Sequence, residues 1–123
     1  MGIDIYLRWA LMTEEEEEAQ LQGYNVCIGH TGYLREAYHG DPYATKLLVP
    51  EAFAAGGEPV HIPAAVLRER LPSVMRAALH RERRIYNTEA NEDSLVVQSF
   101  VDFVNLAEEL EKRGRKPVVF ASY

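Results

Sequence analysis

The sequence predicts an α+β fold, or a small α/β fold, in which a few-stranded sheet with N- and C-terminal strands is covered by a long C-terminal helix. Residues 2–9 alternate strictly between apolar and polar side chains, as a half-buried strand does. Residues 92–113 place apolar side chains at three- and four-residue spacing, which is typical of an amphipathic helix. Residues 117–123 form an apolar run that predicts a terminal strand.

Shorter elements are expected between these segments. Thr13 and Glu16 have the spacing of a capping box, which predicts a short helix over residues 13–22 with its glutamates in a solvated first turn. Residues 24–28 fit a second strand, and residues 33–39 fit two helical turns. Residues 43–49 fit either a strand or a helix, and Pro50 ends whichever forms.

Two prolines divide the stretch that follows. Pro63 and Pro72 are both acceptable at the first position of a helix, where the backbone donors lack partners in any case. We therefore expect one helix over roughly 63–70 and another over roughly 72–86. The 123 residues provide one hydrophobic core, so residues 1–123 are interpreted as a single domain.

Composition and charge exclude several classes of protein. The net charge of −6 argues against sequence-independent binding to duplex nucleic acid. No apolar run is long enough to cross a membrane and the N-terminus does not resemble a signal peptide, so a cytoplasmic location is expected. Six of the thirteen cations lie between Arg68 and Arg84, which predicts a locally positive face suited to a small anion.

Residues 29–43 concentrate polar aromatic side chains between glycines. Tyrosine offers a ring face and a hydroxyl, whereas arginine and histidine offer hydrogen-bond donors. If residues 33–39 are helical, Arg35, Tyr38 and His39 share a face that could hold a phosphate or carboxylate. The predicted ligand-binding residues are Tyr33, Arg35, Tyr38, His39 and Tyr43. This prediction requires the cluster to face an open cavity; the alternative is ordinary packing, with Arg35 paired to a local acid.

A second candidate surface lies on the helix expected over residues 72–86. Arg76, His80 and Arg83 recur there at helical spacing and could receive an anion. The alternatives are a solvated basic face, or a face that pairs with the acidic block of another subunit. We expect a homo-oligomer.

Sequence motifs for common chemistries are missing. The spacings of His30, His39 and His61 match no metal-ligand signature. The sequence also contains no nucleophile elbow, phosphate-binding loop or dinucleotide fingerprint. We expect no metal and no other cofactor.

Several segments resemble those of a group of small uncharacterised bacterial and phage proteins: the opening Met-Gly-Ile-Asp-Ile-Tyr, the central Gly-His-Thr-Gly-Tyr-Leu-Arg-Glu-Ala-Tyr-His-Gly-Asp-Pro-Tyr-Ala-Thr, the Leu-Val-Pro-Glu-Ala-Phe run and the closing Ala-Ser-Tyr. The resemblance spans most of the chain and implies a bacterial or viral setting. Phage proteins of this size include sponges that sequester the nucleotide signals of host immunity, which is an analogy of size and setting.

Together these observations favour a non-catalytic module that binds a small anionic, ring-containing ligand, with a nucleotide-derived signal as the leading example. Arginine would hold the anionic group and tyrosine would stack on the ring. Two alternatives stay open. One is a small hydrolase or transferase acting on a nucleotide or sugar phosphate, with His39 or His30 as general base. The other is an interaction module whose aromatic segment contacts another protein.

Overall fold

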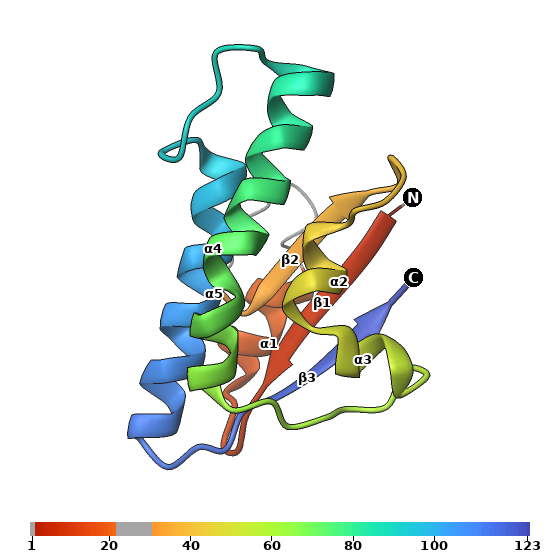
Figure 1. Ribbon diagram of the computed structural model, residues 1–123. Helices are drawn as coiled ribbons and strands as arrows, with labels where there is room; N and C mark the ends of the chain where they lie inside the picture. The colour runs from red at the N-terminus through yellow and green to blue at the C-terminus, as the bar shows by residue number, and fades with distance from the viewer. Residues whose placement is uncertain (1, 22–30) are drawn as a thin grey trace.

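The sheet has three antiparallel strands in the order β2-β1-β3 (Figure 1). The computed structural model describes residues 2–21 and 31–123. The N-terminal strand β1 (Gly2–Arg8) lies in the middle, between β2 (Tyr33–Ala37) and the C-terminal strand β3 (Val118–Ser122). This arrangement confirms the α+β fold and the placement of both terminal strands in one sheet.

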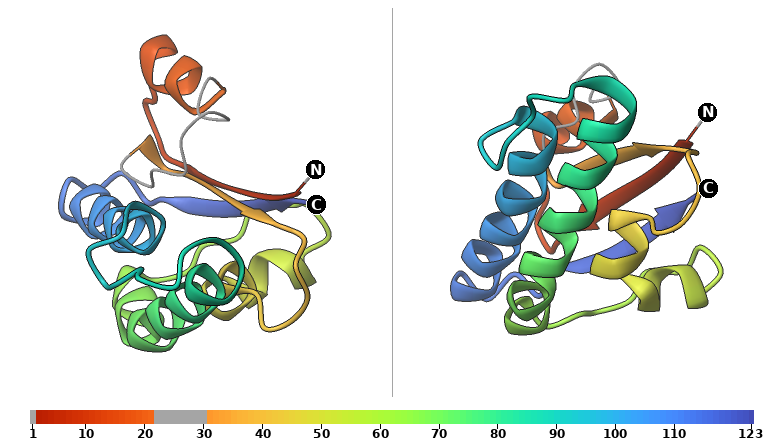
Figure 2. Two further views of the ribbon diagram at one scale, coloured as in Figure 1. Left: turned by 90° about the horizontal axis from the view of Figure 1, so that it is seen from above. Right: turned by 45° about the horizontal axis from the view of Figure 1, so that its top comes forward.

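The helices lie on both faces of this sheet but are unequally divided. They are α1 (Glu14–Leu21), α2 (Ala44–Leu48), α3 (Pro50–Ala54), α4 (Ala64–Arg81), the π-helix η3 (Glu82–Tyr86) and α5 (Leu95–Lys112). Figure 2 shows α2, α3, α4 and α5 on one face and α1 on the opposite face. The long C-terminal helix α5 therefore covers the sheet, as predicted from the sequence. It does so together with α4.

Strand alternation decides which residues reach the helical layer. Ile3, Ile5 and Leu7 of β1 are buried, whereas the residues between them are half-buried. Ile3 pairs with Glu36 of β2, and Asp4 pairs with Arg35. Because paired residues in neighbouring strands point to the same face, Glu36 faces the helices and Arg35 faces outward.

The core between the sheet and the helices is continuous. On α4 the buried side chains follow a four-three spacing at Leu67, Leu71, Val74 and Ala78, so they form one stripe. This stripe packs along α5, which buries Phe100 and Phe103 among other apolar residues. The burial of these two faces is the main source of helix stability here.

The expected helical turns over residues 33–39 are wrong. Residues Tyr33–Ala37 form the edge strand β2, and Tyr38 and His39 follow it outside any regular element. Pairing with five consecutive residues of β1 outweighs the helical spacing of the polar aromatic side chains. Arg35, Tyr38 and His39 consequently do not share a helical face.

The expected division at Pro72 is also wrong, because α4 continues through it. An interior proline removes one helical hydrogen bond and costs about 3 kcal/mol. Tertiary packing compensates, because Leu71 and Val74 are buried on either side of it against the core. The chain after Arg81 does not continue as an α-helix but forms η3, where Asn87 N–H donates to Glu82 O.

The remaining expectations have mixed outcomes. The capping box is confirmed by reciprocal hydrogen bonds between Thr13 and Glu16 of 2.9 and 3.1 Å. Residues 43–49, which fit either element, contain the helix α2. The strand expected over residues 24–28 lies outside the described residues. Within the described ranges, no helix combines the length and the apolar character that crossing a membrane requires.

Candidate functional site

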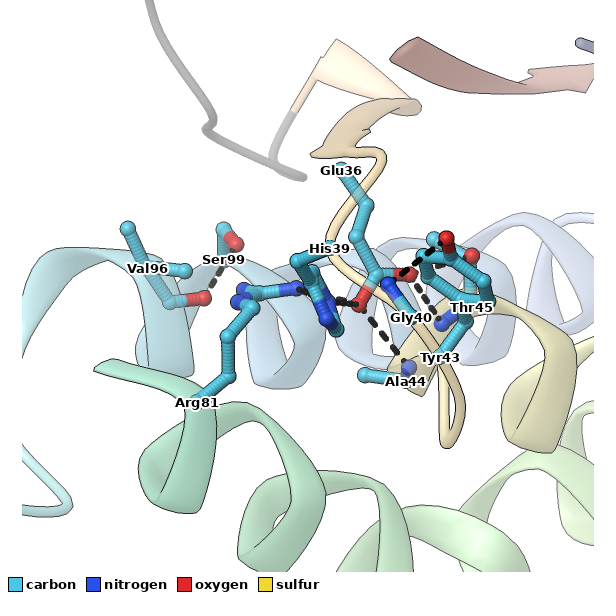
Figure 3. A network of polar contacts seen from close by, with 9 residues as sticks. All are labelled: Glu36, His39, Gly40, Tyr43, Ala44, Thr45, Arg81, Val96 and Ser99. Atoms are coloured by element: carbon cyan, nitrogen blue, oxygen red, sulfur yellow. Dashed lines mark hydrogen bonds and ion pairs between the residues drawn. The ribbon is translucent and has the colours of Figure 1, made fainter. Parts of the chain in front are cut away.

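The carboxylate of Glu36 is the centre of a buried polar network between β2, α2 and α4 (Figure 3). Its Oε1 accepts hydrogen bonds from Thr45 N–H (2.9 Å) and from the Thr45 hydroxyl (2.5 Å). Its Oε2 accepts from Ala44 N–H (2.9 Å) and from Nη1 of Arg81. A buried charge is tolerated only when it is paired and hydrogen-bonded, and Glu36 satisfies both conditions.

Arg81 is the cation of this network and is almost as buried as its partner. The side chains of Arg81 and Glu36 are 6% and 1% exposed. Arg81 is the next buried residue after Ala78 on the stripe of α4, so the helix directs its guanidinium toward the sheet. The same stripe that builds the core thus delivers a charge into it.

His39 is the third member of the network. Its Nε2 lies 3.2 Å from Glu36 Oε2 and 3.2 Å from Arg81 Nη1, and its side chain is only 6% exposed. The other ring nitrogen, Nδ1, is buried and makes no hydrogen bond within the described residues. The ring also packs against Tyr43, with a centroid distance of 4.7 Å.

A cavity of about 240 Å³ lies beside this network, between β2, the C-terminal end of α4, η3 and the start of α5. Its lining residues are Arg35, Glu36, Ala37, Arg81, Glu82, Tyr86 and Val96. Tyr86 is 62% exposed and forms part of the wall. The π-helix brings Tyr86 to this place, and single turns of π-helix are frequent at functional sites.

Arg81 joins the network to the cavity. A guanidinium carries five N–H donors, and in the described part of the chain the hydrogen bonds of Arg81 use Nη1 alone. Donors on Nε and Nη2 therefore remain, and Arg81 lines the cavity. Figure 3 shows the guanidinium reaching from Glu36 toward Val96, another residue of the cavity wall. The arrangement can accept a carboxylate or phosphate in the paired geometry that arginine favours.

Of the first five predicted ligand residues, only Arg35 lines this cavity. Arg35 lies 3.6 Å from Asp4, which matches the alternative of a pair with a local acid. Tyr33 is 2% exposed and its hydroxyl donates a hydrogen bond to Asp4 Oδ1 at 2.6 Å. Its ring is therefore not open to a ligand. Burial and this hydrogen bond to Asp4 both raise the pKa of the Tyr33 phenol well above its usual value.

The other predicted residues are dispersed. Tyr38 is exposed after β2, and Tyr43 is half-buried, with its hydroxyl accepting from Gly40 N–H at 2.9 Å. Arg76 and His80 lie exposed on α4. Arg83 lies in η3, where the π-turn breaks the expected helical stripe, and its Nε donates to Ala90 O at 2.8 Å. Tyr38 lines a second pocket together with Arg35, whereas Tyr43, Arg76, His80 and Arg83 line neither of these two pockets.

Sequence reasoning missed Glu36, Arg81 and Tyr86. A signal for Arg81 was present: the spacing of Leu67, Leu71, Val74 and Ala78 continues to residue 81, so a cation stands on the apolar stripe of α4. A cation at such a position requires a buried carboxylate partner. Glu36 carried no comparable signal, because its orientation depends on whether residues 33–37 form a strand or a helix.

Comparison with known proteins adds no further assignment: no protein-family model, no curated protein and no solved structure matches this chain. Among the described residues, no group of three or more histidine, cysteine, aspartate or glutamate side chains is placed to hold a metal ion. The chemistry of the candidate site therefore has to be argued from Arg81, its network and the cavity.

Proposed function

We propose that this protein is a non-catalytic binding module, located in the cytoplasm, that holds a small anionic ligand with a flat ring in the cavity between β2, α4 and α5. The observation that carries the proposal is the position of Arg81, a buried arginine anchored through Nη1, with donors left over at the cavity wall. A charge-assisted pair with an anion inside a partly enclosed cavity is stronger than the same pair in water.

The ring of the ligand has a natural partner in Tyr86. Its exposed side chain borders the cavity, and aromatic faces stack on flat rings. A volume of about 240 Å³ is slightly below the roughly 300–1,000 Å³ that is usual for ligand pockets. The size favours a small ligand, such as a mononucleotide-like signal, over a larger cyclic oligonucleotide.

Binding without turnover is supported by the state of two acid–base groups nearby, Glu36 and His39. Glu36 is occupied by four donors, and His39 Nε2 lies within hydrogen-bonding distance of Glu36 and Arg81. A general base must reach the proton that it removes, and both groups instead serve internal contacts. Sequestration of a signal requires affinity alone.

The proposal is tested by incubating the purified protein with a panel of cyclic and linear nucleotides, removing unbound ligand and denaturing the protein to recover what it held. Recovery of intact ligand supports a binding module, whereas chemically altered ligand indicates an enzyme. If no member of the panel is retained, the proposal is wrong and a protein partner becomes the better explanation.

Two variants assign the bound ligand to the cavity. Tyr86→Ala removes the stacking face, and Arg81→Lys keeps a cation beside Glu36 while removing the planar set of donors. Both are expected to weaken binding about tenfold or more. The matched control is Tyr123→Ala, because Tyr123 is 61% exposed, close to the 62% of Tyr86, and is not part of this cavity.

A further inference from the structure

The lone pairs of Glu36 are all in use. The two oxygens of a carboxylate offer about four acceptor sites. Ala44 N–H and Arg81 Nη1 occupy Oε2, and Thr45 N–H and the Thr45 hydroxyl occupy Oε1. His39 is thus a fifth polar neighbour of a carboxylate that has about four acceptor sites.

This saturation decides what neutral His39 can do. Its Nε2 is 3.2 Å from Arg81 Nη1, so it can accept a hydrogen bond from that nitrogen while its own proton stays on Nδ1. Nδ1 is the ring nitrogen that has no partner in the described part of the chain. In this state both N–H groups of Nη1 are held inside the network, one by Glu36 and one by His39.

We propose that protonation of His39 regulates anion binding in this cavity, because protonated His39 displaces Nη1 of Arg81 from Glu36, so that this nitrogen adds its donors to those of Nε and Nη2 at the ligand. A protonated imidazole donates from both nitrogens and can no longer accept from Nη1. Its Nε2–H needs an acceptor, and Glu36 Oε2 lies 3.2 Å away. The inference rests on the proposed function, since it concerns the same cavity and the same arginine.

The groups around His39 define the sign of the effect. Glu36 of β2 favours its protonation, Arg81 of α4 opposes it, and Tyr43, which precedes α2, contributes a neutral ring. From α5, Val96 lines the cavity with Arg81 and does not titrate, and the other charged residues of that lining are Glu82 of η3 and Arg35 of β2. An anion next to Arg81 offsets the opposition of that cation. Binding of the anion and protonation of His39 must therefore promote each other, so affinity rises as pH falls.

The experiment needs a probe of constant charge, and benzenesulfonate combines a flat ring with an anion that does not titrate near neutrality. Its affinity is measured by calorimetry at about pH 8 and about pH 5, the range over which histidine changes charge. We expect an increase of about fivefold or more at the lower pH, the usual scale of coupling between two sites. His39→Gln, which can accept from Arg81 but cannot be protonated, is expected to abolish the increase.

The matched control is His61→Gln, because Nδ1 of His61 lies 2.9 Å from Pro117 O and His61 is not a member of the Glu36 network. It should retain the full dependence on pH. An equal increase of affinity in His39→Gln and in the unmodified protein would overturn the inference.

A second measurement needs no ligand and separates this inference from the proposed function. The guanidinium N–H signals of Arg81 and the ring signals of His39 are followed by NMR between about pH 8 and pH 5 in the unliganded protein. Arg81 signals that shift and exchange faster with water as His39 is protonated support the exchange of partners. Arg81 signals that stay constant through the His39 titration contradict it, even if benzenesulfonate binds. A response of Arg81 without binding by any probe contradicts the proposed function alone.

Discussion

Arg35 and Glu36 are neighbours in β2, yet their charged groups belong to two different environments. Arg35 lies on the outer face of the sheet, 3.6 Å from Asp4, and the two side chains are 35% and 20% exposed. Glu36 lies on the inner face, paired with Arg81 in the core. In the inner pair four donors surround one buried carboxylate, whereas the outer pair remains partly hydrated.

The comparison shows that burial, more than the presence of an ion pair, sets what each charge contributes. Water screens an exposed pair and replaces a lost partner at little cost. A buried charge without its partner has no such replacement. We therefore expect the inner network to be sensitive to any loss of a partner and the outer pair to be tolerant.

The largest effect is expected from Glu36→Gln. The change removes the only charge that balances Arg81 within the network, so the free energy of unfolding should fall by about 3–5 kcal/mol. Chemical denaturation measures the loss, and Glu58→Gln, in an exposed turn, is the control with the same side-chain change. A loss below about 1 kcal/mol would place Glu36 in the same class as the outer pair.

An intermediate effect is expected from Thr45→Val. The substitution preserves the shape of the side chain but removes the hydroxyl that donates to Glu36 Oε1 at 2.5 Å. Losing one hydrogen bond to a buried charge should lower the free energy of unfolding by about 1–3 kcal/mol, as seen in denaturation. Thr88→Val, at an exposed position, should be near neutral. Equal effects of the two changes would argue that the Thr45 hydroxyl is not part of the network.

A small effect is expected from Asp4→Asn on the outer face. The amide oxygen can still accept from the Tyr33 hydroxyl, so the change removes chiefly the attraction to Arg35. The expected loss in the free energy of unfolding is at most about 1 kcal/mol and should shrink further at high salt. A loss as large as that of Glu36→Gln would remove the distinction between the two faces.

On the outer face, the Tyr33 phenol should leave the dependence of stability on pH unchanged near neutrality and should lower stability in alkali. The pKa of Tyr33 is raised by burial and by Asp4, so the folded protein binds this proton more tightly than the unfolded chain does. Its contribution to stability is complete below the ordinary tyrosine value of about 10 and is lost as the pH rises above it. The free energy of unfolding, measured from pH 9 upward, should decline more steeply in the unmodified protein than in Tyr33→Phe. Tyr86→Phe, which alters an exposed phenol, should leave the slope unchanged.

Much of the fold could be predicted because it depends on local patterns. The alternation in β1, the periodicity of α5 and the capping box of α1 each appear within one segment and agree with the structure. The sequence alone could not exclude a helix over residues 33–39, because this short polar aromatic segment fits the spacing of a helix as well as that of a strand. Its pairing partner, β1, lies about thirty residues earlier in the chain.

The candidate site was predicted only in its region. Arg35 lines the cavity, but the groups that give the cavity its chemistry come from elements distant in sequence: Arg81 and Tyr86 lie more than forty residues after β2. A proximity of this kind follows from the way α4 packs on the sheet, which no local spacing encodes.

The amino-acid sequence alone determined the class of fold, the terminal strands and the long C-terminal helix, because hydrophobic periodicity expresses which side of an element must leave water. Only the tertiary structure decided which face of β2 turns inward, and with it that Glu36 and not Tyr33 meets Arg81. The physical reason is that a strand exchanges its two faces with a shift of one residue, so the orientation of each side chain is settled by pairing with β1 and by packing against α4.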